Sequence, residues 1–269
     1  MEKVKVCVPI TGKNPAEIEQ QALAIAGTDA DVVEWRFDLA TELYRPFVQP
    51  KANADARDAT EGSSSAEIDA ASKDLLQLQA VITRLRALLS GKELLFTIRT
   101  QRQGGNFPND AAAYRRFCVL ALASAQLDYL DLEDTTAEED SRALMTLAHE
   151  MGVRVIASYH DFEKTPAVEE ILEKLRALRA MGADILKTAY MPTKTSDVAT
   201  LLMATARFRE EDAAKHPLIT MSMGEIGQIS RLVGGAFGSM LTFATVGECS
   251  APGQMPIEAV RAAMTQLSL

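Results

Sequence analysis

A lysine and a histidine stand where their side chains could bond covalently to a substrate and move its protons. Lys187 lies inside the apolar run 183–190 (ADILKTAY), and His160 ends the run 153–160 (VRVIASYH). Lysine is almost never fully buried unless it is paired, and its neutral amine can attack a ketone or aldehyde to form a Schiff base. Lys187 could equally bind an anionic substrate as a point charge. The histidine on the adjacent run favours Schiff-base chemistry, because an imidazole can take the proton that an imine acidifies.

Further charged residues end other apolar runs. The run 31–37 (DVVEWRF) places Glu34 and Arg36 on one face, since side chains alternate along a strand. These two could simply pair with each other on an exposed edge. A closed barrel has no edge, and burying two charges only to neutralise each other gains little stability. We therefore expect a role in function, and Arg99 ends the run 93–100 (ELLFTIRT) in the same way.

Two loops late in the chain carry groups that suit an anion. Arg231 lies in 227–231 (GQISR), and Ser250 and Gln254 lie in 250–254 (SAPGQ). Arginine with hydroxyl and amide donors suits a carboxylate or a phosphate. Either loop alone is a weak signal, because Pro-Gly is an ordinary turn and arginine an ordinary surface residue.

These candidate residues lie on or just after β-rich runs that alternate with helical patterns. The eight runs are 3–10, 31–37, 93–100, 127–133, 153–160, 183–190, 217–223 and 240–246. Eight strand–helix units in about 250 residues predict a single-domain (β/α)8 TIM barrel, an α/β fold with its active site at the carboxyl ends of the strands. A doubly wound open sheet is the competing architecture. Such a sheet usually has a Gly-rich turn after its first strand, and TGKNP at 11–15 lacks that pattern.

The composition is that of an ordinary soluble globular protein. The 269 residues are 47% apolar and 24% charged, with a net charge of −9, which excludes disorder throughout and argues against a nucleic-acid partner. No apolar run approaches the ~18 residues of a membrane span, and no signal peptide is visible, so we expect no membrane partner. Cys7, Cys118 and Cys249 show no disulfide or metal-binding pattern. We expect a reduced, cytoplasmic protein.

The segment 49–73 interrupts the alternation of strands and helices. It is rich in Ala, Asp, Ser and Glu and has almost no large apolar side chain, so it can bury little surface. We predict an exposed, mobile insertion between the strand at 31–37 and its helix. A catalytic lid is the alternative interpretation.

Six segments taken together resemble the type I 3-dehydroquinate dehydratase family. They are EWRFD, LLFTIRT, SYHDF, ADILKTAYMP, ITMSMGEIGQISRL and SAPGQ, and they occur in the family's order. The resemblance implies a TIM barrel that is commonly a homodimer, with no metal or organic cofactor. It also implies the syn elimination of water from 3-dehydroquinate to give 3-dehydroshikimate, a step of the shikimate pathway and of aromatic amino acid biosynthesis.

The resemblance implies roles for individual residues. Lys187 corresponds to the lysine that condenses with the C3 ketone of the substrate. His160 corresponds to the base that removes a C2 proton, protonates the departing C1 hydroxyl and assists imine formation and hydrolysis. Arg231 corresponds to the arginine that holds the substrate carboxylate.

Other positions match groups that shape the site. The loop that closes over the ligand corresponds to Ser250 and Gln254. The groups that hold the ring hydroxyls correspond to Glu34, Arg36 and Arg99. The apolar walls correspond to Met223 and Phe243.

One position departs from the family's pattern. The family usually has a glutamate just before the two glycines that follow the third strand, and this chain has Gln103 there (RQGG). The glutamate orients the histidine and favours its charged form, whereas a glutamine keeps the hydrogen bond and loses the charge. We expect a slower enzyme whose rate rises in Gln103→Glu. Glu34 or Glu133 could supply the missing charge.

Two alternatives stay open. A catalytically impaired paralogue could bind dehydroquinate-like acids without releasing product. Another class I Schiff-base aldolase could act on a sugar phosphate, although such an enzyme would normally hold phosphate with backbone N–H groups after the last two strands.

Overall fold

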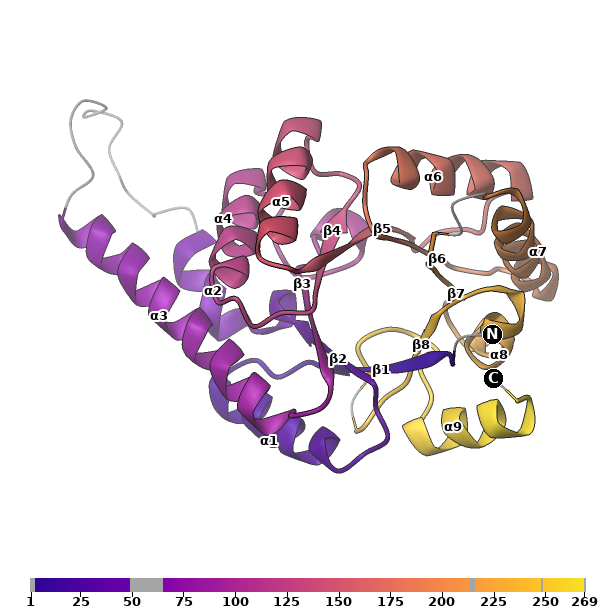
Figure 1. The fold of residues 1–269 in the computed structure, drawn as a ribbon, viewed down its shortest axis with the longest axis horizontal. Helices are drawn as coiled ribbons and strands as arrows, with labels where there is room; N and C mark the ends of the chain where they lie inside the picture. The colour runs from indigo at the N-terminus through magenta and orange to yellow at the C-terminus, as the bar shows by residue number, and fades with distance from the viewer. Residues whose placement is uncertain (1–2, 49–64, 213–215, 248, 269) are drawn as a thin grey trace.

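Eight parallel strands form one sheet with helices around it (Figure 1). The computed structural model describes residues 3–48, 65–212, 216–247 and 249–268, with the backbone alone for 65–75. The strands are β1 (Lys5–Ile10), β2 (Val32–Arg36), β3 (Glu93–Thr97), β4 (Tyr129–Glu133), β5 (Arg154–Asp161), β6 (Ile185–Tyr190), β7 (Leu218–Ser222) and β8 (Leu241–Phe243). The α-helices are α1 (Pro15–Ala26), α2 (Thr41–Val48), α3 (Ser65–Leu88), α4 (Ala111–Leu122), α5 (Glu138–Glu150), α6 (Val168–Ala180), α7 (Thr195–Glu211), α8 (Gln228–Val233) and α9 (Ile257–Gln266). Three short 3₁₀ turns are η1 (Phe37–Leu39), η2 (Gln101–Gln103) and η3 (Gly234–Phe237).

The strands follow one another in sequence order around the sheet, β8-β1-β2 and on to β7. The two ends of the sheet meet where Met240 N donates to Leu218 O at 2.7 Å, beside a bridge between Leu218 and Ser239. The predicted TIM barrel is therefore confirmed. The doubly wound sheet is wrong, because such a sheet reverses its strand order at a switch point.

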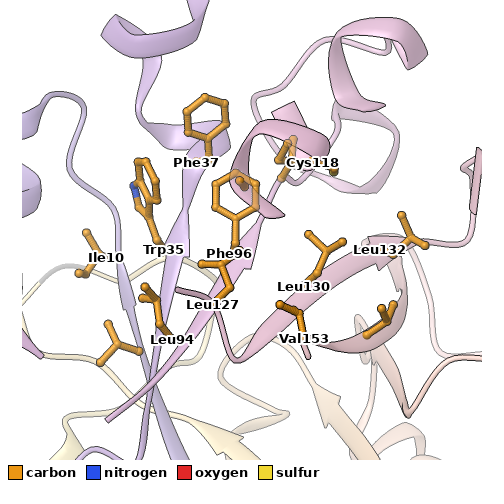
Figure 2. Packing of buried hydrophobic residues seen from close by; sticks show 14 of the residues in the cluster. Ile10, Trp35, Phe37, Leu94, Phe96, Cys118, Leu127, Leu130, Leu132 and Val153 are labelled. Atoms are coloured by element: carbon orange, nitrogen blue, oxygen red, sulfur yellow. The ribbon is translucent and has the colours of Figure 1, made fainter. Parts of the chain in front are cut away.

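Alternation along the strands sorts side chains between two cores. On β2, Trp35 points outward and packs against Phe96, with 5.5 Å between ring centroids (Figure 2). Val32 on the same strand belongs to a second cluster inside the barrel. Glu34 and Arg36 share the inward direction of Val32. The strand thus carries both charges into the barrel at its carboxyl end.

The segment 49–73 differs in part from its prediction. Residues 49–64 lie outside the described residues, so a mobile insertion or a lid is untested there. Residues 65–73 are not part of an insertion before the helix, because α3 begins at Ser65. Their sequence, SAEIDAASK, is rich in alanine, which has the highest helix propensity, and the scarcity of large apolar side chains hid that signal.

Within the described part of the chain, no helix combines the length and the apolar character needed to cross a membrane.

Candidate active site

A cavity of about 130 Å³ lies at the carboxyl ends of the strands. All eleven residues that the sequence predicts for the site line this cavity: Glu34, Arg36, Arg99, Gln103, His160, Lys187, Met223, Arg231, Phe243, Ser250 and Gln254. They come from six strands or strand ends, from the turn η2, from helix α8 and from the loop after β8. The fold thus brings together residues that are far apart in the sequence.

Lys187 is a buried, paired amine. Its side chain projects from β6, and the residue is 3% exposed. Its Nζ lies 2.8 Å from Asp131 Oδ2, 3.7 Å from Glu34 Oε1 and 4.9 Å from the centroid of the Phe243 ring. Two carboxylates and an aromatic face therefore hold the amine in place, as a buried lysine requires.

Asp131 is the centre of a buried charge network. It accepts from Arg99 at 2.9 Å and from Ser158 Oγ at 2.6 Å, besides its contact with Lys187. Burial by itself raises the pKa of Asp131, but the cations of Arg99 and Lys187 hold that pKa well below its usual range. Asp131 therefore stays a carboxylate, able to stabilise a positive charge at the lysine nitrogen.

Arg99 faces the cavity and is held in place by carboxylates of the protein. Its NH1 donates to Glu133 Oε1 at 2.9 Å and to Ser158 Oγ at 3.0 Å. Burial opposes its charge, yet Asp131 and Glu133 raise its pKa above the ordinary value. The guanidinium is therefore a cation in a fixed position at the wall of the cavity.

Glu34 and Arg36 do not pair with each other in the described structure. Glu34 accepts from Thr97 Oγ1 at 2.9 Å. Arg36 donates through two nitrogens to Asp38, at 2.7 and 2.8 Å, and through NH1 to Ser250 O at 3.3 Å. Mutual neutralisation therefore does not account for these charges. The bidentate contact instead fixes the plane of the Arg36 guanidinium at the cavity.

His160 lies on the inward face of β5, beside β6. Ser158, two residues earlier, pairs in register with Lys187, so the histidine lies closer to the carboxyl end than the lysine. Its Nδ1 is 2.9 Å from Gln103 Oε1. Burial, followed by the cations of Arg99 and Lys187, holds the pKa of His160 well below its ordinary value. The imidazole is therefore neutral at neutral pH and ready to accept a proton.

Glycines place Gln103 beside the histidine. Gln103 ends the turn η2, and Gly104 follows with φ +77°. At Gly105 a Cβ would lie 2.0 Å from Arg99 O, because the chain doubles back there and Gly105 N donates to Thr100 O. Only glycine fits this return.

Neither glutamate considered above contacts the histidine. Glu133 accepts from the backbone N and the Oγ1 of Thr100, at 2.9 and 2.6 Å. Glu34 belongs to the ion pair of the lysine. Gln103 is the group bound to Nδ1 of His160, so neither glutamate replaces the missing carboxylate there.

Arg231 is a buried cation without a carboxylate partner among the described residues. It is 2% exposed, its NH2 donates to Pro252 O at 3.0 Å, and its NH1 lies 3.6 Å from Met221 Sδ. Its Nε is buried without a hydrogen-bond partner. Burial lowers the pKa of Arg231 to about 10. A buried cation with a free donor beside a cavity is suited to an incoming anion.

The loop after β8 closes one side of the cavity. Ser250 N donates to Gln254 Oε1 at 2.8 Å, and Gln254 Nε2 donates to Ser250 Oγ at 3.1 Å. A Cβ at Gly253, which has φ +79°, would lie 2.2 Å from Gly224 O. The glycine lets this loop pack directly on the loop after β7. Met223 and Phe243, both buried, supply apolar surface beside it.

Sequence reasoning left several residues of this network out of the site. Asp131 and Glu133 were visible as two charges in the apolar strand YLDLE, two residues apart and hence on one face. That is the pattern that singled out Glu34 and Arg36. Asp134, which binds Gln103, carried no such signal because it follows the strand.

Comparisons with known proteins show which family this chain matches. Residues 6–269 match the sequence profile of the type I 3-dehydroquinase family. The 3-dehydroquinate dehydratase of Klebsiella pneumoniae (strain 342) is 38% identical over 263 residues, which cover 98% of this chain and 93% of the relative.

Two solved structures have the same fold over nearly the whole chain. The type I 3-dehydroquinate dehydratase from Clostridium difficile, with covalent modified comenic acid, has a TM-score of 0.84 and 31% identity over 99% of this chain and 93% of its own. The 3-dehydroquinate dehydratase from Geobacillus kaustophilus has a TM-score of 0.85 and 31% identity over 99% of this chain and 92% of its own. The resemblance found in six short motifs is thus confirmed, and the chain belongs to the type I 3-dehydroquinase family of hydro-lyases.

Proposed function

We propose that this enzyme eliminates water from 3-dehydroquinate through an imine at Lys187. The observation that carries the proposal is a buried lysine and a neutral histidine, on adjacent strands, lining one cavity. Family membership supports the substrate. The Clostridium difficile relative, which contains covalent modified comenic acid, supports a site of this kind that can bond covalently to a ligand.

Binding begins at Arg231. The substrate carboxylate would meet the free Nε and the NH groups of this arginine, which the protein leaves without a carboxylate partner. Arg36 and Arg99 offer donors to the ring hydroxyls from fixed positions. The loop with Ser250 and Gln254 then covers the ligand.

The covalent step uses the pair of Lys187 and His160. His160 takes one proton from the Lys187 ammonium, and the freed amine adds to the C3 carbonyl. The imidazolium then returns that proton, so that the carbinolamine oxygen leaves as water and an iminium forms. The cationic nitrogen replaces the ammonium beside Asp131, so the ion pair stabilises the intermediate without rearrangement. The proton on C2 becomes acidic because the iminium accepts the electron pair of that bond.

The elimination then needs one group that takes a proton and returns it. His160 takes the C2 proton, the resulting enamine expels the C1 hydroxyl, and the imidazolium gives its proton to that oxygen to form water. One imidazole acts on one face of the ring, so the elimination is syn. A water molecule from solvent then hydrolyses the new iminium and restores Lys187. Two waters have been released by then and one is consumed, so the net change is the loss of one water.

Borohydride trapping tests this function. We expect 3-dehydroquinate plus borohydride to add a reduced ligand covalently at Lys187, found by mass spectrometry of peptides. Lys187→Ala should lose both the adduct and nearly all turnover. Lys164→Ala, which changes an exposed lysine after β5, should keep both. An adduct that persists in Lys187→Ala would overturn the assignment.

Turnover separates this proposal from the two alternatives. A non-catalytic paralogue would form the adduct without releasing 3-dehydroshikimate. A sugar-phosphate aldolase would be trapped by a sugar phosphate instead of 3-dehydroquinate. The observation against the aldolase is the side-chain anion site at Arg231.

We assign the reaction to the shikimate pathway, in the cytoplasm, with a homodimer as the working form. Light scattering of the purified protein tests the dimer.

A further inference from the structure

The side chain of Gln103 is bound at both ends. It is 2% exposed, its Oε1 lies 2.9 Å from Nδ1 of His160, and its Nε2 donates to Asp134 Oδ1 at 2.8 Å. The other oxygen of Asp134 accepts from Lys174 Nζ at 2.8 Å. A chain of contacts thus runs from the histidine to an ion pair behind it.

The ion pair is anchored to the barrel. Asp134 is the first residue after β4, and its backbone N donates to Ser158 O on β5 at 3.0 Å. Lys174 projects from α6, and its ammonium lies 4.1 Å from the centroid of the Tyr159 ring. The Asp134 side chain is 14% exposed. The carboxylate therefore has a fixed position beside the amide.

This arrangement determines which way the amide of Gln103 faces. An ionised carboxylate only accepts hydrogen bonds, so the group that meets Asp134 is the NH₂. The carbonyl oxygen must then face His160. A carbonyl oxygen only accepts, so Nδ1 of the neutral imidazole carries the proton and Nε2 keeps its lone pair.

We propose that Asp134 is a positioning residue that fixes the tautomer of His160 through Gln103, so that Nε2 is the base at the cavity. The catalytic consequence rests on the proposed function, but the tautomer itself does not. Other charges that face the imidazole, namely Arg36, Arg99, Asp131 and Lys187, set its protonation and do not touch Nδ1.

The same contact changes the expectation for Gln103→Glu. That substitution alone would place two carboxylates face to face at hydrogen-bond distance, and one of them would take up a proton. The histidine would gain little or no charge beside it. The rate should therefore rise only when Asp134→Asn accompanies Gln103→Glu.

Three variants make this testable. In Asp134→Asn, Lys174 would still donate to the side-chain oxygen, so the new NH₂ would face Gln103. The Gln103 amide would turn over, present its own NH₂ to Nδ1 and select the opposite tautomer. In the double variant with Gln103→Glu, the carboxylate accepts from both neighbours and restores the Nδ1–H form. Lys174→Met leaves the acceptor at position 134 and should keep that form.

Ring-nitrogen NMR of ¹⁵N-histidine-labelled protein reads the tautomer directly, with His160→Gln to assign the resonances. We expect Nδ1–H in the wild type, Nε2–H in Asp134→Asn and Nδ1–H again in the double variant. With 3-dehydroquinate, kcat should fall roughly 10²-fold or more in Asp134→Asn, because a misdirected base loses most of its effect. In the double variant kcat should return to the wild-type value or exceed it. KM should change little, since Asp134 is not among the residues that line the cavity.

The outcomes separate the two proposals. An Nε2–H tautomer in the wild type overturns the inference, even if every variant fails to fold. An unchanged tautomer and kcat in folded Asp134→Asn also overturn it. The third outcome is that the three proteins show the expected tautomers but neither the wild type nor any variant consumes 3-dehydroquinate. In that case the positioning role of Asp134 stands and the proposed function fails.

Discussion

Arg231 differs from the other buried cations of the cavity in what surrounds it. Arg36 is matched by Asp38, Arg99 by two carboxylates and Lys187 by Asp131. Arg231 meets a backbone carbonyl and a thioether, and its Nε has no partner. An unmatched buried charge is costly. This is the observation on which the proposed binding of a substrate carboxylate at Arg231 rests.

Arg231→Ala should therefore weaken substrate binding more than it slows the chemistry. Loss of a buried, charge-assisted contact costs about 2–4 kcal/mol, roughly a 30- to 1000-fold rise in KM. Arg231→Lys should recover only part of this, because the planar fork is lost. Steady-state kinetics on both variants check the prediction. An analogue without the carboxylate should bind the wild type and Arg231→Ala alike, and equal weakening of that analogue would contradict the role.

The neutral state of His160 predicts the acid side of the pH profile. Burial and then the cations of Arg99 and Lys187 lower its pKa below 6.5. As the proposed base, His160 stays neutral in the free enzyme down to that lowered pKa, and its protonation at lower pH removes the base. A plot of kcat/KM against pH should thus stay level through neutral pH and fall only below pH 6.5.

His160→Ala provides the control for that profile. It should lower turnover by roughly 10²–10⁴ and remove the acidic limb. An acidic limb that persists in His160→Ala would belong to another group.

At the scale of elements, the sequence predicts the strands well and the start of helix α3 poorly. Each strand carries its own signal, because apolar side chains alternate with the inward charges, as in EWRF and LDLE. The eight predicted runs differ from the observed strands by no more than three residues at any end. The helical start of α3 at Ser65 was missed because it lacks an apolar stripe.

The contacts between residues of the site are harder to predict from the sequence than the residues themselves. Residue type and strand position are enough to predict Lys187 and His160, because the reactivity of an amine and of an imidazole is known from the residue type. The contact between Gln103 and Asp134 joins residues 31 positions apart, from a turn and a strand end. No local pattern encodes such a distance, so only the fold reveals that the amide has an acceptor behind it.

At the scale of the whole molecule, the described residues form one barrel, and the segment 49–64 lies outside them. It contains no large apolar side chain (QPKANADARDATEGSS), so it has little to bury. Replacement of residues 49–64 by a Gly/Ser segment of equal length should leave Tm and kcat nearly unchanged. The replaced segment ends at residue 64 because α3 begins at Ser65.

Thermal unfolding and turnover of that variant decide between the two interpretations of the segment. A large fall in kcat at unchanged Tm would identify it as a lid. A fall in both would place it in an interface.

The seam between β7 and β8 has a consequence for local opening of the barrel. Among the described residues the seam holds the bridge between Leu218 and Ser239, whereas β5 and β6 pair over the six positions from Ile156 to Asp161. Backbone amides with few neighbouring hydrogen bonds exchange with solvent through small fluctuations, at a free energy far below that of global unfolding. Among the described residues, β8 pairs with β1 over three positions but meets β7 only at this bridge. Exchange at 239–243 should thus outpace exchange in β5 and β6, each of which pairs with a strand on both sides. The helix with Arg231 and the loop with Ser250 flank this seam, so the barrel can loosen around its ligand there while the strands that carry Lys187 and His160 stay paired.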